Sequence, residues 1–274
     1  MPLSVTFDLE DNRRSADQEE RFVRMSDRFL AFAAEREIRA TVFVVGEIAR
    51  SHPWLVRRVA AAGHEVALHG LRHVSLGDVG RSRLRAELRE GKALLEDVAQ
   101  VRVDGFRAPI FSLTPSTAWA LEDLAAAGFA YSSSVLPAAN PLHGWPGAPA
   151  TPFRWATAGI VELPCPVTGV GRALVPFLGG IYLRYLPQRL TVRALRRLPT
   201  GAAPWSYCHP YDLDPDEKFF VMPHAGWVTS RIVHSRRGAT LRRLDSVIAA
   251  AGGAGPTLRE LAVEAGRREL PVVR

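Results

Sequence analysis

The sequence is poor in cysteine, lysine and long apolar runs. Its 274 residues include two cysteines, Cys165 and Cys208, and two lysines, Lys92 and Lys218. Two cysteines make no disulfide framework, and the separation of this pair suits no zinc knuckle. No apolar run approaches the roughly 20 residues that a membrane-spanning helix needs, and the N-terminus lacks the basic segment and apolar core of a signal peptide. We therefore expect a cytoplasmic protein without a transmembrane segment.

Positive charge is concentrated in the last third of the chain. Residues 1–171 contain 19 Lys and Arg against 20 Asp and Glu, a net charge of −1, whereas residues 172–274 contain 16 against 8, a net charge of +8. Such an excess suits nucleic acid, an anionic membrane or substrate, or a solvated basic face. There is no nucleic-acid motif and no basic stretch interleaved with aromatics. We expect no nucleic-acid partner, and an anionic, nucleotide-linked or lipid-linked carrier of the substrate is one interpretation.

Strand-like and helix-like segments alternate along most of the chain. Apolar, β-branched runs predict strands at 3–7, 40–45, 65–68, 103–107, 159–163 and 205–210. Helical periodicity predicts helices at 17–36, 47–62, 81–99, 115–127, 240–250 and 257–265. Alternation with short connections indicates an α/β fold with a parallel sheet. We expect one domain over residues 1–274, with a loop-rich, proline-dense insertion near 137–187 and a basic helical part near 216–274.

Polar clusters follow three of these strands, at residues 8–11, 69–73 and 107–109. In barrels built from parallel strands, catalytic residues lie at the carboxyl ends of the strands. His69 and His73 are spaced i, i+4, so on one helical turn both imidazoles could bind one divalent metal, with zinc, nickel or cobalt suited to such ligands. The alternative is that they are ordinary core or surface histidines.

The first cluster contains three acids, Asp8, Glu10 and Asp11. One carboxylate could complete a metal site of two histidines and one acid, while another acts as a general base. Asp8 and Glu10 share a side if the strand continues, which leaves Asp11 apart. A solvated turn is the alternative interpretation of the same residues.

Five segments, in order, give the chain a family resemblance: Val5–Asp8, Ala40–Gly46, Gly63–His73, Gly105–Pro109 and Tyr207–Pro210. Together they resemble the polysaccharide deacetylase family, the carbohydrate esterase family 4 enzymes that share the NodB homology domain. The resemblance implies a distorted (β/α) barrel. Residues 107–112, 179–184 and 209–215 also resemble the exopolysaccharide-associated branch, which acts inside the cell.

The resemblance implies a role for each matching residue. Asp8 would be the general base, Arg107 its partner, and His209 the general acid. The metal, most simply zinc with nickel or cobalt as alternatives, would be held by Glu10, His69 and His73, with Asp11 as the rival to Glu10. Pro109, Phe111 and Trp145 would line the substrate groove. The fourth family motif departs from the pattern, because Ser132 stands where an Asp is usual and leaves the orientation of His209 without an explanation.

The implied reaction is metal-assisted hydrolysis of an N-acetyl group on an amino-sugar substrate. An allantoinase-like cyclic amide hydrolase and a catalytically inactive carbohydrate-binding relative are the alternatives. The sequence leaves the acetylated substrate and the oligomeric state open.

Overall fold

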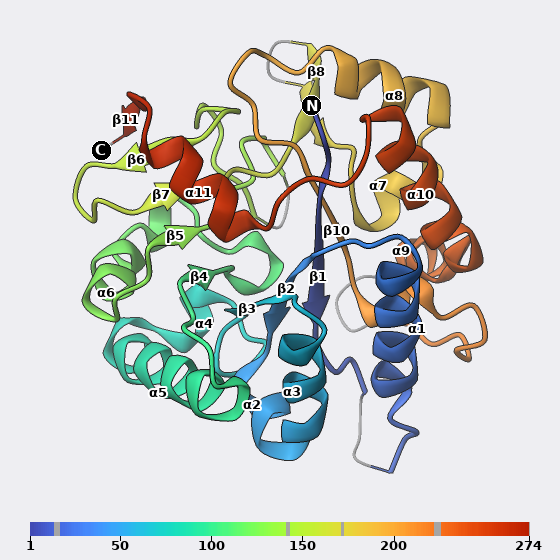
Figure 1. The fold of residues 1–274 in the computed structure, drawn as a ribbon, viewed down its shortest axis with the longest axis horizontal. Coiled ribbons are helices and arrows are strands. Elements are labelled where there is room, and N and C mark those ends of the chain that lie inside the picture. The colour runs from blue at the N-terminus through green and yellow to red at the C-terminus, as the bar shows by residue number, and fades with distance from the viewer. Residues whose placement is uncertain (14–16, 141–142, 171–172, 222–225, 274) are drawn as a thin grey trace.

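A nine-stranded sheet forms the centre of the molecule (Figure 1). The computed structural model describes residues 1–13, 17–140, 143–170, 173–221 and 226–273. The strands run in the order β10-β1-β2-β3-β4-β5-β7-β6-β11, and a separate hairpin pairs β8 with β9. Their bounds are β1 Ser4–Leu9, β2 Thr41–Val44, β3 Glu65–Leu68, β4 Gly105–Phe106, β5 Tyr131–Ser132, β6 Phe153–Trp155, β7 Val161–Glu162, β8 Val167–Val170, β9 Ala173–Pro176, β10 Trp205–Cys208 and β11 Val272–Val273.

The helices flank this sheet, with α1, α3 and α5 along its outside in Figure 1. The α-helices are α1 Arg21–Glu35, α2 Gly46–Ser51, α3 Pro53–Ala61, α4 Leu76–Val79, α5 Arg81–Ala99, α6 Ala120–Ala126, α7 Gly180–Tyr185, α8 Gln188–Arg196, α9 Gly226–His234, α10 Thr240–Ala250 and α11 Leu258–Gly266. Short 3₁₀ turns lie at η1 Pro109–Phe111, η2 Pro115–Thr117, η3 Pro210–Leu213 and η4 Arg237–Ala239. No helix in the described ranges is long and apolar enough to cross a membrane.

The parallel register brings the carboxyl ends of neighbouring strands together. β1 pairs in parallel with both β10 and β2, and β2, β3, β4 and β5 continue the parallel arrangement. At the far edge, β6 pairs antiparallel with β7, and β11 pairs in parallel with β6, so these two strands run opposite to the rest of the sheet. β1 is buried on both faces, as expected for a strand covered by helices. The predicted α/β barrel-like fold is confirmed, and its strand ends converge where the polar clusters lie.

Most predicted elements are confirmed, and several boundaries are corrected. The predicted strand 65–68 and the helices 81–99 and 240–250 match β3, α5 and α10 to the residue. The predicted helix 47–62 is two helices, α2 and α3, because Pro53 begins the second one and the residue before a proline disfavours helical geometry. Helices α7, α8 and α9 and the β8–β9 hairpin were not predicted.

Helix α1 is held on turn η3 by an ion pair. Arg21 Nε and Nη2 donate to the two carboxylate oxygens of Asp214 at 2.5 and 2.6 Å, and Asp214 is buried. Burial alone would raise the pKa of Asp214, but the hydrogen bonds and charge of Arg21 outweigh it and lower that pKa below its ordinary value of 3.8. Because the pKa of Asp214 is lowered in the folded state, its ion pair with Arg21 stabilises the fold above about pH 4. That stabilisation is lost as the pH falls and the carboxyl becomes protonated.

We predict that Asp214→Asn lowers the free energy of unfolding by about 2 kcal/mol at pH 7, the range for charge-assisted hydrogen bonds. Urea unfolding at several pH values measures this free energy. The difference between the variant and the unmodified chain should shrink below pH 4, where Asp214 of the unmodified chain becomes protonated. Asp245→Asn is the matched control, because Asp245 bonds Arg36 with similar geometry at an exposed position, where such pairs contribute little. An equal loss in both variants would contradict the prediction.

Candidate active site

Strand β1 delivers two carboxylates to the carboxyl edge of the sheet. Asp8, in β1, and Glu10, just after it, are both buried with 2% exposure. Alternate residues of an extended chain point to one side, so both side chains face the cavity described below. The expected pairing of these two residues on one side therefore agrees with the structure.

Glu10 meets the two histidines of the second cluster. One ligand atom each from Glu10, His69 and His73 lies within 4.8 Å of the others. The histidines do not lie on the helical turn that their spacing suggested. They lie in an irregular loop after β3, where Gly70 adopts a φ of +79° that favours glycine. The side chain of Asp11 instead bonds that of Arg13, which leaves Glu10 as the acid of the cluster.

The candidate ligand atoms of Glu10, His69 and His73 lie close together, but they do not satisfy one another's hydrogen bonding. His69 Nδ1 donates to the Arg107 carbonyl at 2.9 Å, which leaves its Nε2 as the unprotonated nitrogen. Glu10 Oε2 is buried without a hydrogen bond, although it lies 2.5 Å from His73 Nε2. An orphaned buried carboxylate oxygen beside two imidazole nitrogens fits a bound divalent cation. The hydrogen bond on the far nitrogen of His69 is the usual support of a metal-binding histidine.

Burial and charge shift the pKa values of these groups in opposite directions. Burial lowers the pKa of His69 to about 4, so its imidazole is neutral near pH 7. Burial opposes the ionised form of Glu10, but the charges of His73 and His209 outweigh it and hold the pKa of Glu10 well below its usual range. Burial likewise lowers the pKa of His73, but the Glu10 carboxylate raises it overall. A neutral imidazole and an ionised carboxylate are the forms that bind metals.

Arg107 fixes Asp8. Its Nη1 lies 2.5 Å from Asp8 Oδ1 and 2.8 Å from Thr6 Oγ1, and its Nε and Nη2 bond the carbonyl and hydroxyl of Ser133 at 3.1 Å. The guanidinium is fully buried, with Phe43 and Trp205 ring centroids 4.0 and 4.3 Å from its central carbon. Asp8 Oδ2 remains directed toward the histidines, 4.0 Å from His69 Nε2.

His209, after strand β10, completes the constellation. Its Nε2 lies 3.8 Å from Asp8 Oδ2, and its ring stacks on Tyr211 with centroids 4.7 Å apart. Its Nδ1 lies 2.7 Å from Asp212 Oδ2. Burial alone would lower the pKa of His209, but the charges of Glu10, Asp212 and Asp8 raise it to about 9.

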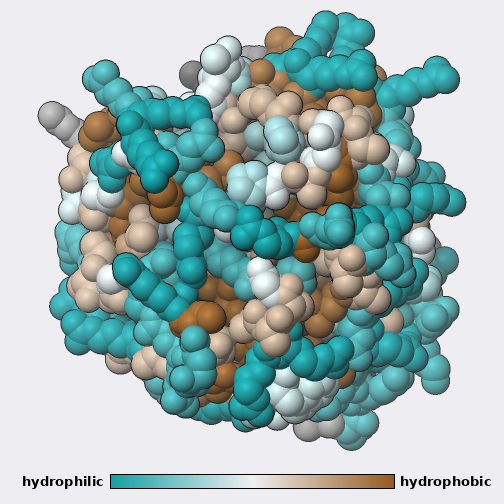
Figure 2. Space-filling model, viewed as in Figure 1, coloured by the Kyte–Doolittle hydropathy of each residue, from teal (hydrophilic) through white to brown (hydrophobic). Residues whose placement is uncertain are grey.

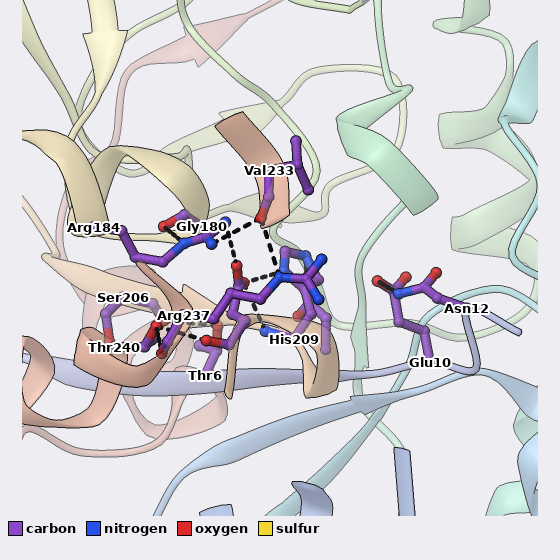
Figure 3. A network of polar contacts seen from close by, with 12 residues as sticks. Thr6, Glu10, Asn12, Gly180, Arg184, Ser206, His209, Val233, Arg237 and Thr240 are labelled. Atoms are coloured by element: carbon purple, nitrogen blue, oxygen red, sulfur yellow. Dashed lines mark hydrogen bonds and ion pairs between the residues drawn. The ribbon is translucent and has the colours of Figure 1, made fainter. Parts of the chain in front are cut away.

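Asp212 is itself held by a second buried arginine. Arg184 Nη2 lies 2.9 Å from Asp212 Oδ1, and both side chains are fully buried. Arg184 Nη1 also donates to the carbonyls of Val233 and Ser235 at 2.8 Å. Figure 3 shows Arg184 and Arg237 converging on the Val233 carbonyl near His209.

Asp212 and Arg184 were not predicted as site residues. Ser132, which stands at the usual fourth-motif position, bonds Ser134 at 2.8 Å and not His209. The available signal was the His-Pro-x-Asp spacing of residues 209–212, where turn η3 folds the carboxylate back onto the imidazole and the His209 backbone N–H. The carboxylate that contacts the His209 imidazole thus comes from Asp212, three residues along the chain, and not from position 132.

These groups face a cavity of about 640 Å³, and an adjoining cavity of about 350 Å³ shares Glu10 and Tyr211 with it. Of the expected groove residues, Phe111 lines the larger cavity, together with Ile110, which was not predicted. Pro109 is buried beneath. Trp145 does not reach either cavity, since it packs on Trp155 with ring centroids 4.7 Å apart. The complete lining of the larger cavity is Asp8, Glu10, Asp11, Asn12, Arg13, His69, His73, Arg107, Ala108, Ile110, Phe111, His209, Tyr211, Glu217, Phe220, Val233 and Arg237.

Comparison with known proteins assigns the first part of the chain. The polysaccharide deacetylase family model matches residues 2–130, which contain Asp8, Glu10, His69, His73 and Arg107. This part of the chain, just under half of it, is similar to that family. A second model, described as a domain of unknown function (DUF3473), matches residues 133–251 and covers His209, Asp212 and Arg184. The candidate site is therefore assembled from residues of both matched segments.

One curated relative and two solved structures are also similar to this chain. A chitooligosaccharide deacetylase from Sinorhizobium fredii is 38% identical over 77 residues, which are 28% of this chain and 36% of that protein. The match thus spans about a third of the relative's length. A candidate polysaccharide deacetylase from Mycobacterium smegmatis superposes with a TM-score of 0.63 at 21% identity, covering 99% of this chain and 93% of its own. The allantoinase Puue superposes with a TM-score of 0.59 at 18% identity, covering 95% of this chain and 88% of its own. These two structures share the fold.

We predict that the chain binds one divalent cation, with Zn²⁺ as the ion to test, and that binding raises its melting temperature, because the ion stabilises only the folded state. Calorimetric titration should show at least about tenfold weaker binding for His69→Ala and for His73→Ala. His143→Ala is the control, since His143 is half-buried and outside the cluster. Unchanged affinity in both cluster variants would contradict a site at these residues.

Proposed function

We propose that this chain is a metal-dependent N-deacetylase that removes the acetyl group from an amino sugar in an N-acetylated carbohydrate. The observation that carries the proposal is one cavity that holds a cation-binding cluster, a carboxylate and a protonatable histidine together. Asp8 Oδ2 lies 4.0 Å from His69 Nε2 and 3.8 Å from His209 Nε2. Those distances allow one acetamide and one water to contact all three.

Glu10, His69 and His73 would hold the cation. One carboxylate and two imidazoles suit zinc first, with nickel or cobalt as alternatives. When bound, the ion supplies Lewis-acid polarisation of the amide carbonyl and makes a water molecule more acidic.

Asp8 would accept the proton of the attacking water. Arg107 occupies its Oδ1, so Oδ2 is the oxygen left for the water. The backbone at Ile110 and Phe111 adopts φ values of 51° and 54°, a left-handed conformation that is unusual for such residues. Strain of this kind is concentrated at functional sites, and we assign this segment to the oxyanion that develops on the carbonyl.

His209 would protonate the leaving amine. With its pKa raised to about 9, the imidazole carries a proton at neutral pH. Asp212 accepts from Nδ1, so Nε2 presents that proton to the cavity. The proton would move from Nε2 to the amine nitrogen as the C–N bond breaks.

The chitooligosaccharide named for the Sinorhizobium relative is the first substrate class to test. We further propose that the chain belongs to the exopolysaccharide-associated branch and that its sugar substrate is attached to an anionic carrier. The net charge of +8 over residues 172–274 supports such a carrier.

We predict that Asp8→Asn reduces acetate release from an N-acetylated chitooligosaccharide by about 10²–10⁴-fold, the contribution typical of a general base. Asp97→Asn, at an exposed position on α5, should retain full activity. Acetate is measured directly, and ureide products from allantoin are measured in parallel. Full activity of Asp8→Asn would refute its assignment as base, and ureide formation would favour the allantoinase-like alternative. Glycan binding without metal or acetate release would favour an inactive relative.

We predict that Asp212→Asn reduces acetate release from the amide by at least about tenfold but largely spares hydrolysis of 4-nitrophenyl acetate. The nitrophenolate leaves without protonation, so a mis-oriented or deprotonated His209 affects only the amide substrate. His209→Ala should show the same selectivity, and Asp212→Glu should restore part of the amide activity. Equal losses on amide and ester in Asp212→Asn would indicate a purely structural role.

A further inference from the structure

Helix α9 presents apolar side chains to solvent. Trp227, Val228 and Ile232 are 61%, 65% and 39% exposed. Ser230 on the opposite face is fully buried, with its hydroxyl donating to the Gly226 carbonyl. A surface helix ordinarily turns its apolar face inward, so α9 has the reversed arrangement. An exposed apolar patch of this kind marks an interaction surface.

Neighbouring residues extend this face into one surface. Phe219 and Val221 are 37% and 44% exposed. The Phe219 and Trp227 rings meet edge to face at 6.3 Å, and the Arg231 guanidinium lies 4.9 and 5.7 Å from their centroids. We call this surface the α9 patch; it comprises Phe219, Val221, Trp227, Val228, Arg231 and Ile232.

The α9 patch lies at the rim of the active-site cavity. Phe220 and Val233, which adjoin patch residues in the chain, line that cavity. Arg184 and Arg237 both bond the Val233 carbonyl, and the Tyr185 hydroxyl bonds the Ile232 carbonyl at 3.2 Å. The apolar face of α9 is therefore fixed in place beside the catalytic groups.

Charge identifies what covers the patch. Residues 218–243 contain six basic side chains and no acidic one; Arg237 is buried and paired with Glu217, which leaves five of them to charge the surface. Two copies meeting through this surface would bring like charges together, which disfavours self-association. Helix α8, which packs on α10, adds exposed arginines at 189, 193 and 196. Figure 2 shows hydrophilic side chains projecting at the upper right, where α8 lies in Figure 1.

We propose that the α9 patch docks the protein on an anionic lipid bilayer. The aromatic and aliphatic side chains would enter the interfacial layer while arginines contact lipid phosphates, the combination by which amphipathic helices bind membranes. A consequence that rests on the proposed function is the substrate class: an N-acetylated glycan anchored in that bilayer, presented to the cavity beside α9.

Co-sedimentation of the full chain with vesicles tests the docking without any substrate. Binding is expected to phosphatidylcholine vesicles that contain phosphatidylglycerol, but not to pure phosphatidylcholine. Trp227→Ser should weaken binding at least about tenfold, and Arg231→Gln about fivefold. Trp54→Ser and Arg58→Gln are matched controls, because this exposed pair on α3 has the same stacked geometry at 5.7 Å. Val228→Ser replaces Trp227→Ser if the latter fails to fold by circular dichroism.

Three outcomes would overturn the docking: equal binding to both vesicle types, no binding to either, or unchanged binding of the folded patch variant. A dimer that Trp227→Ser converts to monomer in sedimentation velocity would also overturn it, in favour of a second copy. Acetate release from a soluble chitooligosaccharide should be the same for Trp227→Ser and the unmodified chain. If the unmodified chain releases acetate but binds neither vesicle type, only the docking is refuted; if it binds the anionic vesicles but releases no acetate, only the deacetylase is refuted.

Discussion

The ion pair between Arg107 and Asp8 is the constraint on which the rest of the site depends. A guanidinium with no exposure has lost its hydration and is tolerated only when its donors are satisfied. Arg107 meets this requirement with Asp8, Thr6 and Ser133, which lie in β1 and just after β5, and with two aromatic faces. Its own carbonyl accepts from His69. One residue thereby sets the orientation of Asp8, the proposed base, and of His69 in the candidate metal-binding cluster together.

The sequence was informative where chemistry and fold coincide. Asp8, Glu10, His69, His73, Arg107 and His209 all face one cavity because each follows or ends a strand of the same parallel arrangement. Alternation along β1 favoured Glu10 but left Asp11 as a rival, and in the structure the Asp11 side chain bonds Arg13. The strand-end rule does not depend on the local geometry of the loop, so the histidine pair was found although its predicted helical turn was wrong.

The sequence was less informative where a contact depends on how irregular segments fold. Asp212 reaches His209 only because Pro210 begins a 3₁₀ turn. Arg184 reaches Asp212 only because α7, which was not predicted, packs behind that turn. Trp145 was expected in the groove because the resembled family has a tryptophan near its fourth motif. It is partly buried and packs on Trp155 instead, which gives its ring an aromatic contact away from the cavity. Side-chain partners of this kind have no periodic signature.

Arg184 connects His209, the proposed general acid, to the surface of the molecule. Its charge is fully buried, so its two-sided bonding to Asp212 and to the carbonyls of Val233 and Ser235 cannot be lost without a large penalty. Those carbonyls belong to the end of α9 and the residue after it. The position of α9, and with it the exposed patch around Trp227, is therefore tied to the same buried charge that holds Asp212 against His209. A protein that needed only a catalytic histidine could have oriented it with an acid on a neighbouring strand. Because Arg184 bonds both Asp212 and the end of α9, the orientation of the histidine and the position of the cavity rim are one structural requirement.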